Sequence, residues 1–358
     1  MTRLSDIYRG RRVLVTGHTG FKGSWLTAWL NQMEAEVAGF ALDPSTAPNH
    51  WDLLSLPIAD IRADIRDFSS VQRTVREHRP EIVFHLSAQP LVRRSYKDPL
   101  ESWSTNVIGT ANVLEACRSA RDLRAIVVVT TDKVYANNEC TRGYREDDRL
   151  GGHDPYSASK AAAELVVDSY RKSFFSGQGE PLIATARAGN VIGGGDWSED
   201  RLIPDILRAL SCGHSLEIRS PKATRPWQHV LECTAAYLLL GQHLLEGNRD
   251  AAGAWNFGPN ADDNQTVAAI LAELRNYWPE LQWHESEAKH PHEAGLLYLD
   301  TAKAKSMLGW KPVWNLTTAL AATADWYRQQ ASTKNPPTYQ QLSGYRKAAA
   351  LAGCSWAE

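Results

Sequence analysis

A strand-to-helix turn near the N-terminus reads Arg12-Val13-Leu14-Val15-Thr16-Gly17-His18-Thr19-Gly20-Phe21-Lys22-Gly23. Apolar residues that favour β-structure run into three glycines spaced by three, and a helix-period segment follows from Trp25 to Met33. A helix entered through glycines binds anions, because free N–H groups and the positive end of the helix dipole meet there. In a doubly wound α/β fold that anion is usually a dinucleotide pyrophosphate. The spacing is GxxGxxG rather than GxGxxG, so a simple glycine-rich turn is the alternative.

The composition is that of an ordinary globular protein, with 358 residues, 43% of them hydrophobic and 22% charged. A net charge of −2 argues against nucleic acid or an anionic membrane as partner. No apolar run is long enough for a membrane span, and no signal-peptide pattern appears. The five cysteines form neither a metal motif nor a disulfide framework, which predicts a cytoplasmic protein without a metal site: Cys117, Cys140, Cys212, Cys233 and Cys354.

Strand and helix patterns alternate through the first half and predict a doubly wound parallel Rossmann sheet. We expect strands at 36–42, 58–63, 81–86, 124–130 and 182–187, and helices at 69–78 and 100–120. Further helices are expected at 202–210, 231–245, 266–277 and 316–329. We therefore predict an NAD-binding domain over 1–187, with contributions from about 229–258. Residues 188–358 would form mainly a smaller, interleaved substrate domain, and the tail from Lys334 an extended arm.

An acidic residue marks the end of the second predicted strand. Asp43 lies 20 residues beyond Gly23, where a carboxylate can accept hydrogen bonds from an adenosine ribose. No arginine stands within a few positions to hold a 2′-phosphate, so the pattern favours NAD over NADP. The alternative is an aspartate that only starts the turn before Pro44.

Two short motifs carry reactive side chains. Tyr156 and Lys160 are four residues apart at the start of a predicted helix, so the phenol and the ammonium share one face. A cation beside the phenol would lower the pKa of the tyrosine and make it a general base. Thr131, Asp132 and Lys133 follow the apolar strand 124–130, at the carboxyl end where open parallel sheets bind ligands. A solvated aromatic–lysine pair and a polar turn are the alternatives.

Together these motifs resemble the extended short-chain dehydrogenase/reductase family, in order and in spacing from about Arg11 to Pro312. The resemblance implies an NAD-binding Rossmann fold. It also implies that the cofactor contacts lie at Gly17, Thr19, Gly20, Phe21, Lys22, Gly23, Asp43, Asp64, Ile65, Leu86, Ala88, Gln89, Asn106, Thr130, Tyr156 and Lys160.

Within that family the chain looks like a sugar-nucleotide 4,6-dehydratase. Most of this group carry Thr-Asp-Glu where this chain has Thr131-Asp132-Lys133. Lys133 in place of this Glu, together with the glycine loop and Pro291-His292-Glu293-Ala294, resembles the pattern of the branch that acts on CDP-glucose. A second branch with Asp-Lys, acting on UDP-N-acetylglucosamine, has a much shorter interval to the tyrosine than the 23 positions between Lys133 and Tyr156.

The resemblance implies catalysis by Thr131, Asp132, Lys133, Tyr156 and Lys160. Tyr156 would take the proton from the sugar 4-hydroxyl, with Thr131 bonded to the same oxygen, while hydride passes from C4 to a tightly bound NAD. Asp132 would protonate the departing 6-hydroxyl and Lys133 would take the C5 proton, before the hydride returns to C6. These roles require a protonated Asp132 and a neutral Lys133. An ion pair between the two would need another base.

The substrate contacts implied by the resemblance are Gln89, Thr131, Asn190, Arg201, Arg219, Arg225, His292 and Tyr298. An arginine such as Arg225 can grip a diphosphate through two N–H groups. Residues that read the cytosine base cannot be assigned in this way.

Family likeness also implies deoxysugar biosynthesis, as for lipopolysaccharide O-antigen, and a homodimer or a tetramer. The dimer would form through the helices predicted at 100–120 and 156–175, with apolar faces at Val107, Val113 and Leu114 and at Ala161, Leu165 and Val166. A 4-epimerase, another 4,6-dehydratase or a non-catalytic NAD-binding module on the same fold are the alternatives.

Overall fold

The computed structural model describes residues 3–139, 142–288 and 295–357. A seven-stranded sheet organises the chain, with strand order β11-β6-β5-β4-β1-β2-β3 and every neighbouring pair parallel. Its strands are β1 (Arg12–Thr16), β2 (Glu36–Ala41), β3 (Ala59–Arg62), β4 (Ile82–His85), β5 (Ala125–Val129), β6 (Leu182–Ala188) and β11 (Ala254–Phe257). The predicted doubly wound parallel sheet is confirmed.

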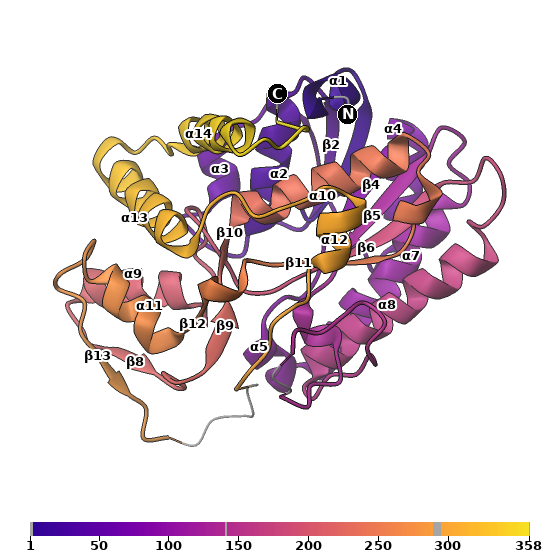
Figure 1. Cartoon of the computed structure of the whole chain (residues 1–358). Helices are drawn as coiled ribbons and strands as arrows, with labels where there is room; N and C mark the ends of the chain where they lie inside the picture. The colour runs from indigo at the N-terminus through magenta and orange to yellow at the C-terminus, as the bar shows by residue number, and fades with distance from the viewer. Residues whose placement is uncertain (1–2, 140–141, 289–294, 358) are drawn as a thin grey trace.

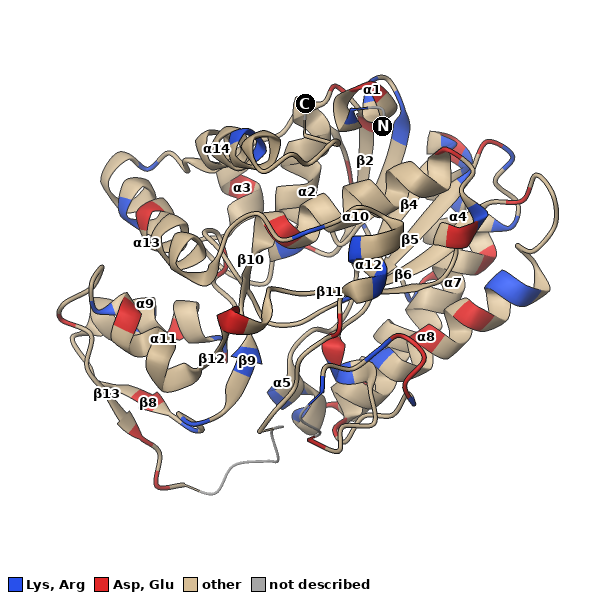
Figure 2. Cartoon of the chain, viewed as in Figure 1, with Lys and Arg blue, Asp and Glu red and all other residues tan. Residues whose placement is uncertain are grey.

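Helices cover both faces of this sheet (Figure 1). One layer contains α2 (Phe21–Gln32) and α10 (Val230–Leu245), and the other contains α4 (Phe68–His78), α7 (Gly109–Cys117) and α8 (Pro155–Ser173). Central strands therefore need apolar residues on both sides, and every residue of β5 is buried. Acidic and basic residues are interspersed along the outer side of α8 (Figure 2).

The remaining strands are short, with two or three residues each, and pair into three small two-stranded sheets. Four of them, β8, β9, β12 and β13, lie with α9 and α11 at the lower left of Figure 1. The strands are β7 (Val191–Ile192), β8 (Leu216–Ile218), β9 (Thr224–Pro226), β10 (Gln228–His229), β12 (Asn264–Thr266) and β13 (Trp283–Glu285). The helices are α1 (Leu4–Tyr8), α3 (His50–Leu54), α5 (Val92–Lys97), α6 (Pro99–Trp103), α9 (Leu202–Cys212), α11 (Val267–Leu274), α12 (Ala302–Met307), α13 (Leu316–Thr333) and α14 (Thr338–Leu351). The domain boundaries given above stay a prediction.

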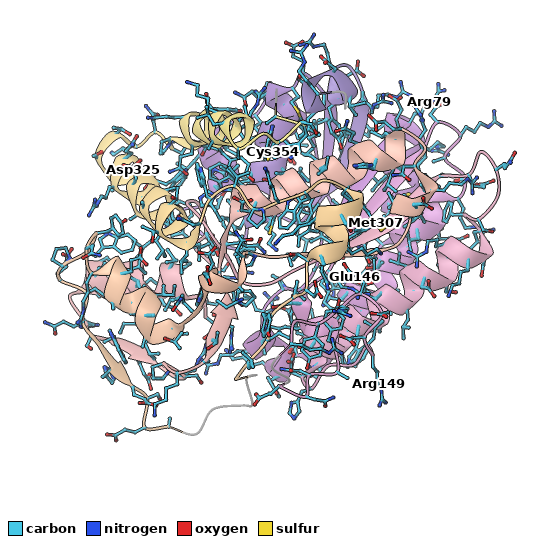
Figure 3. The ribbon with its side chains drawn as sticks, in the orientation of Figure 1. Arg79, Glu146, Arg149, Met307, Asp325 and Cys354 are labelled. Carbon is cyan, nitrogen blue, oxygen red and sulfur yellow. The ribbon has the colours of Figure 1, made fainter. Side chains whose placement is uncertain are left out.

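The C-terminal tail is not an extended arm, and that expectation is wrong. Helix α14 packs on the sheet-covering helix α2, with the Tyr345 ring 5.9 Å from that of Trp29. The Tyr345 hydroxyl donates a hydrogen bond to Glu232 of α10 at 2.8 Å. Three residues after α14 are buried as well: Cys354, which Figure 3 labels, Trp356 and Ala357. Pro337 at the N-cap of α14 begins the helix instead of preventing it, since proline is tolerated at a helix start.

The long helix expected at 100–120 forms in three pieces, because a π-helical turn (Ser104–Ile108) lies between α6 and α7. Its proposed dimer face is partly wrong. Val113 and Leu114 are fully buried in the core beneath the sheet, so they cannot face a partner. Large apolar side chains are exposed on both helical segments of the predicted interface: Leu100 and Trp103 on α6, Ile108 in the π-helical turn, and Leu165 on α8.

Candidate active site

A cavity of about 960 Å³ opens at the carboxyl ends of β5 and β6. The N-terminus of α8 forms one wall, and α9 and β8 form the opposite one. Ten of the predicted site residues line it: Lys22, Thr130, Thr131, Asp132, Lys133, Tyr156, Asn190, Arg201, Arg219 and Arg225. The fold thus gathers at one sheet edge residues that lie up to 203 positions apart in the chain.

The turn after β5 holds its reactive groups by local hydrogen bonds. Thr131 caps the short 3₁₀ turn Asp132–Val134, because its hydroxyl oxygen accepts from the Lys133 N–H at 3.4 Å. The same hydroxyl donates to Oδ1 of Asp132 at 3.0 Å. Asp132 is 1% exposed, and its Oδ2 has no hydrogen-bond partner among the described residues. A buried carboxylate oxygen without a partner is costly, which marks this atom as one kept for a ligand.

Gly189 leaves the space beside that oxygen. A Cβ at this position would lie 3.0 Å from Oδ2 of Asp132 and 2.4 Å from the Pro226 ring. The ion pair that would have undone the predicted division of roles is not formed: no salt bridge joins Asp132 and Lys133 within the part of the chain that the structure describes.

Burial has the largest effect on the pKa of Tyr156 in this structure. Desolvation raises the pKa of Tyr156 to about 12, and the negative charge of Asp132 acts in the same direction. A hydrogen bond with Thr131 and the charge of Arg201 oppose the shift without cancelling it. The expected lowering of this pKa by Lys160 is therefore not found for the protein alone, because desolvation of the phenolate outweighs the cations.

Lys160 lies on the same helix face and is buried. Its Nζ donates to the carbonyl oxygen of Val129, the last residue of β5, at 3.2 Å. Burial and the nearby charge of Lys22 lower the pKa of Lys160 to about 8. Lys22 itself lines the cavity, and burial lowers its pKa too. The charge of Lys22 thus acts on Lys160 from the border of the cavity.

Arginines line the opposite wall. Arg201 pairs with Asp196 at 3.3 Å, and Arg219 pairs with Asp200 at 3.3 Å. Arg225 is 7% exposed and donates to the carbonyl oxygen of Thr224 at 3.0 Å. Sequence reasoning missed three further arginines of the lining, Arg149, Arg208 and Arg93. Of these, Arg93 of α5 donates to Asp200 at 2.8 Å. Only the fold brings it there, because no motif surrounds it.

Two predicted substrate contacts, Gln89 and Tyr298, do not line the cavity, and a third falls outside the described residues. The amide of Gln89 is engaged inside the protein: Nε2 donates to Ser102 at 2.7 Å, and Oε1 accepts from the Leu91 N–H at 2.6 Å. Gln89 is therefore better explained as a residue that shapes the loop after β4 than as a ligand contact. Tyr298 is not among the residues that line the cavity. His292 lies outside the described residues, as does the whole segment 289–294.

The glycine loop separates into a packed part and an open part. Gly17 has φ +78°, and a Cβ there would lie 2.6 Å from the Ser87 N atom. At Gly23 a Cβ would lie 2.0 Å from the Gly17 carbonyl oxygen. Gly20 caps the 12-residue helix α2 with ordinary backbone angles, and a Cβ would meet only the Gly17 oxygen at 3.4 Å. The loop thus leaves space at Gly20, in front of the helix N-terminus, which fits a phosphate ligand.

The remaining cofactor residues surround this loop at the same sheet edge. Asp43 follows β2 with an exposed side chain, 3.7 Å from Nη1 of Arg62 on β3. An arginine therefore does stand near this carboxylate, brought there from the next strand. Thr19 donates to the Leu42 carbonyl oxygen at 3.0 Å. Asp64 pairs with Arg66, and the buried Ile65 packs where a Cβ on Gly109 would clash.

Asn106 has a structural explanation. Its Oδ1 accepts from the Gln89 N–H at 2.9 Å, and its Nδ2 donates to the Gln89 carbonyl oxygen and to Ser159. It therefore joins the loop after β4, which carries Leu86 and Ala88, to helix α8. Its position in the π-helical turn is what aims the amide at both.

The parallel sheet, the glycine loop and the Tyr156–Lys160 helix define an extended short-chain dehydrogenase/reductase. The chain belongs to the GDP-mannose 4,6-dehydratase family, whose model matches residues 14–323. It is 46% identical over 330 residues to the CDP-glucose 4,6-dehydratase of Salmonella typhimurium, covering 90% of this chain and 92% of that protein. It is 29% identical to a dTDP-glucose 4,6-dehydratase of Xanthomonas campestris, covering 88% and 92%.

A solved structure agrees with this placement. The UDP-glucose 4-epimerase of Thermus thermophilus, in complex with NAD, matches with a TM-score of 0.76 and 25% identity, covering 88% of this chain and 99% of that one. The family resemblance expected from the sequence is confirmed.

Each helix in the described part of the chain is too short or too polar to span a bilayer.

Proposed function

We propose that this chain is a CDP-glucose 4,6-dehydratase, which converts CDP-D-glucose to CDP-4-keto-6-deoxy-D-glucose and water. The identity to the Salmonella enzyme over most of both chains supports the choice of substrate. The chemistry of the cavity supports the reaction class. Both observations are needed, because a family likeness alone does not distinguish a dehydratase from an epimerase.

Asp132 is the observation that carries the dehydratase assignment. Elimination of the 6-hydroxyl needs an acid next to the leaving oxygen, and Asp132 presents a buried oxygen with no partner among the described residues. A 4-epimerase has no bond to break at C6 and would need no such acid. A carboxyl oxygen that faces the cavity without a protein partner is placed to pass a proton to a bound ligand.

The chain's own residues divide the work along the sugar. Tyr156, hydrogen-bonded to Thr131, takes the proton of the 4-hydroxyl. A carbonyl at C4 makes the C5 hydrogen acidic, and Lys133 on the cavity wall takes that proton. Asp132 donates to the 6-hydroxyl as water leaves. Lys160 shares the helix face of Tyr156 and is held at the end of β5, where its ammonium would stabilise the phenolate during the reaction.

The residues around the glycine loop fit NAD. The space at Gly20 would take the pyrophosphate, and Asp43 would accept from the ribose hydroxyls. Bound there, NAD supplies a reversible hydride acceptor, so that the reaction has no net oxidation or reduction.

The arginines of the opposite wall suit the diphosphate. Arg225 is buried and Arg201 and Arg219 are half-buried, so their charges act through a less polar medium than water.

The free thiols Cys117, Cys212, Cys233 and Cys354 support a reducing cytoplasm as the location. We also propose a homodimer through the exposed Leu100, Trp103, Ile108 and Leu165, with the product serving deoxysugar biosynthesis.

The test is a panel of nucleotide sugars. The purified protein is incubated with CDP-, dTDP-, GDP- and UDP-glucose, and the 4-keto product is followed by its absorbance in alkali. We expect CDP-glucose to be the best substrate. Faster turnover of another nucleotide sugar would reject the substrate, and a 4-epimer without loss of water would reject the reaction.

A further inference from the structure

We propose that the buried ion pair Glu164–Arg187 is the positioning pair of the active site, which holds the catalytic turn Thr131–Lys133 from both of its ends. Neither residue lines the cavity itself, and neither stood out in the sequence. The inference rests on the proposed function for its kinetic part only.

Glu164 lies four residues after Lys160 and eight after Tyr156, on the same face of α8. Its carboxylate receives four donors from two strands. Oε1 accepts from Thr130 at 2.5 Å and from Nε of Arg187 at 2.9 Å. Oε2 accepts from Thr185 at 2.7 Å and from Nη2 of Arg187 at 2.9 Å. Both side chains of the pair are 4% exposed, so the arrangement is dry and fully satisfied.

The pair reaches the catalytic turn on both sides. Thr130, bonded to Glu164, is the residue before Thr131. Tyr135 follows the 3₁₀ turn, and its hydroxyl accepts from Nη1 of Arg187 at 2.8 Å. That hydroxyl donates onward to Oδ1 of Asn256 on β11 at 2.7 Å. The turn with Asp132 and Lys133 is therefore fastened at each end to one rigid ion pair.

One further contact fixes the pair itself. Nη1 of Arg187 also donates to the carbonyl oxygen of Glu146, which Figure 3 labels. The same helix α8 carries Tyr156 and Lys160, so Glu164 ties the tyrosine to the turn as well. Since acid, base and tyrosine must act on adjacent sugar atoms, a shift of the turn against α8 would misalign all three.

A matched pair of threonines tests this. Thr130→Val and Thr185→Val each remove one hydroxyl donor from the same buried carboxylate, but only Thr130 belongs to the strand that enters the turn. Tyr135→Phe cuts the other end and leaves the Glu164–Arg187 pair intact. These isosteric changes keep the fold measurable, whereas removing Glu164 would strand a buried charge.

Backbone hydrogen exchange at residues 131–135 is the first readout, and it needs no substrate. We expect faster exchange in Thr130→Val and Tyr135→Phe than in the parent, and parental exchange in Thr185→Val. The second readout is turnover of CDP-glucose. Thr130→Val and Tyr135→Phe should lower kcat about tenfold with KM within about twofold, because misplacement affects the transition state more than binding. Deuterium at C5 should then slow turnover more than it does in the parent.

Equal exchange at 131–135 in all three variants would overturn the inference. So would a loss of kcat in Thr185→Val that matches that of Thr130→Val, because the pair would then support only stability. If the parent protein fails to turn over CDP-glucose, the proposed function is rejected, while the exchange measurement still decides whether the pair holds the turn.

Discussion

Two buried carboxylates near the end of β5 have opposite surroundings. Glu164 accepts four hydrogen bonds and pairs with Arg187, whereas Asp132 has one oxygen bonded to Thr131 and the other without a partner among the described residues. Burial acts to raise the pKa of Glu164, but Arg187 and the hydroxyl donors outweigh it and lower that pKa. One carboxylate is satisfied by the protein and the other is kept for a ligand. This difference distinguishes a carboxylate that supports the structure, Glu164, from one that is available for the reaction, Asp132.

Asp132→Asn should give the largest effect. The amide cannot donate the proton that the 6-hydroxyl needs, so we expect dehydration to fall by about 10²–10⁴-fold, the usual contribution of a general acid. The midpoint of thermal unfolding should stay constant or rise, because an unpartnered buried carboxylate is replaced by a neutral group. Product formation and thermal unfolding are measured on the same sample. Full activity, or a large loss of stability, would place Asp132 with Glu164 among the supporting residues.

A third buried carboxylate sharpens the comparison because no cation of the described residues pairs with it. Glu232 accepts from the N–H groups of Val313 and Trp314 and from the Tyr345 hydroxyl. Burial raises the pKa of Glu232 to about 7, and these donors offset it only in part. It fastens α10 to the segment before α13 and to α14 and does not line the cavity, so its protonation should affect stability more than catalysis.

Proton linkage determines how Glu232 changes the stability of the fold with pH. The folded protein binds the Glu232 proton more tightly than the unfolded chain does, so the stabilisation is complete below about pH 4.5 and is lost as the pH rises toward 7. The shift corresponds to about 3 kcal/mol. Denaturant unfolding between pH 5 and 8 should therefore show a smaller decline for Glu232→Gln than for the parent. Parallel pH profiles for the two proteins would contradict the raised pKa.

The same contrast explains what the sequence could predict. The first strand, the glycine loop and the motif residues Tyr156 and Thr131 follow from local patterns, and the sheet brings their strand ends together by topology. Glu164 looked like any charged residue on a helix, because its partner Arg187 is 23 positions away. Its spacing of four from Lys160 was the one available signal.

Other features depend on tertiary packing that no local pattern carries. Pro336-Pro337 suggested an arm, yet Leu342 and Tyr345 bury against α2 and α10. Val113 and Leu114 look like any apolar helix face, and only the sheet decides that they belong to the core. The Tyr156 pKa likewise depends on how much water the fold removes, which outweighs the charge four residues away.

The glycine loop repeats the contrast on a smaller scale and gives the mildest prediction. Gly17 and Gly23 are packed against the protein, whereas Gly20 faces open space. Gly20→Val should raise the dissociation constant for NAD about tenfold or more, because the side chain enters the space of the pyrophosphate, with little change in the unfolding midpoint of the cofactor-free protein. Gly23→Ala is the matched change: its Cβ would lie 2.0 Å from the Gly17 oxygen, so it should lower that midpoint as well. Titration with NAD and thermal unfolding separate the two. If Gly20→Val destabilised the loop as much as Gly23→Ala does, the space at Gly20 would be structural, and the loop would not hold the cofactor as proposed.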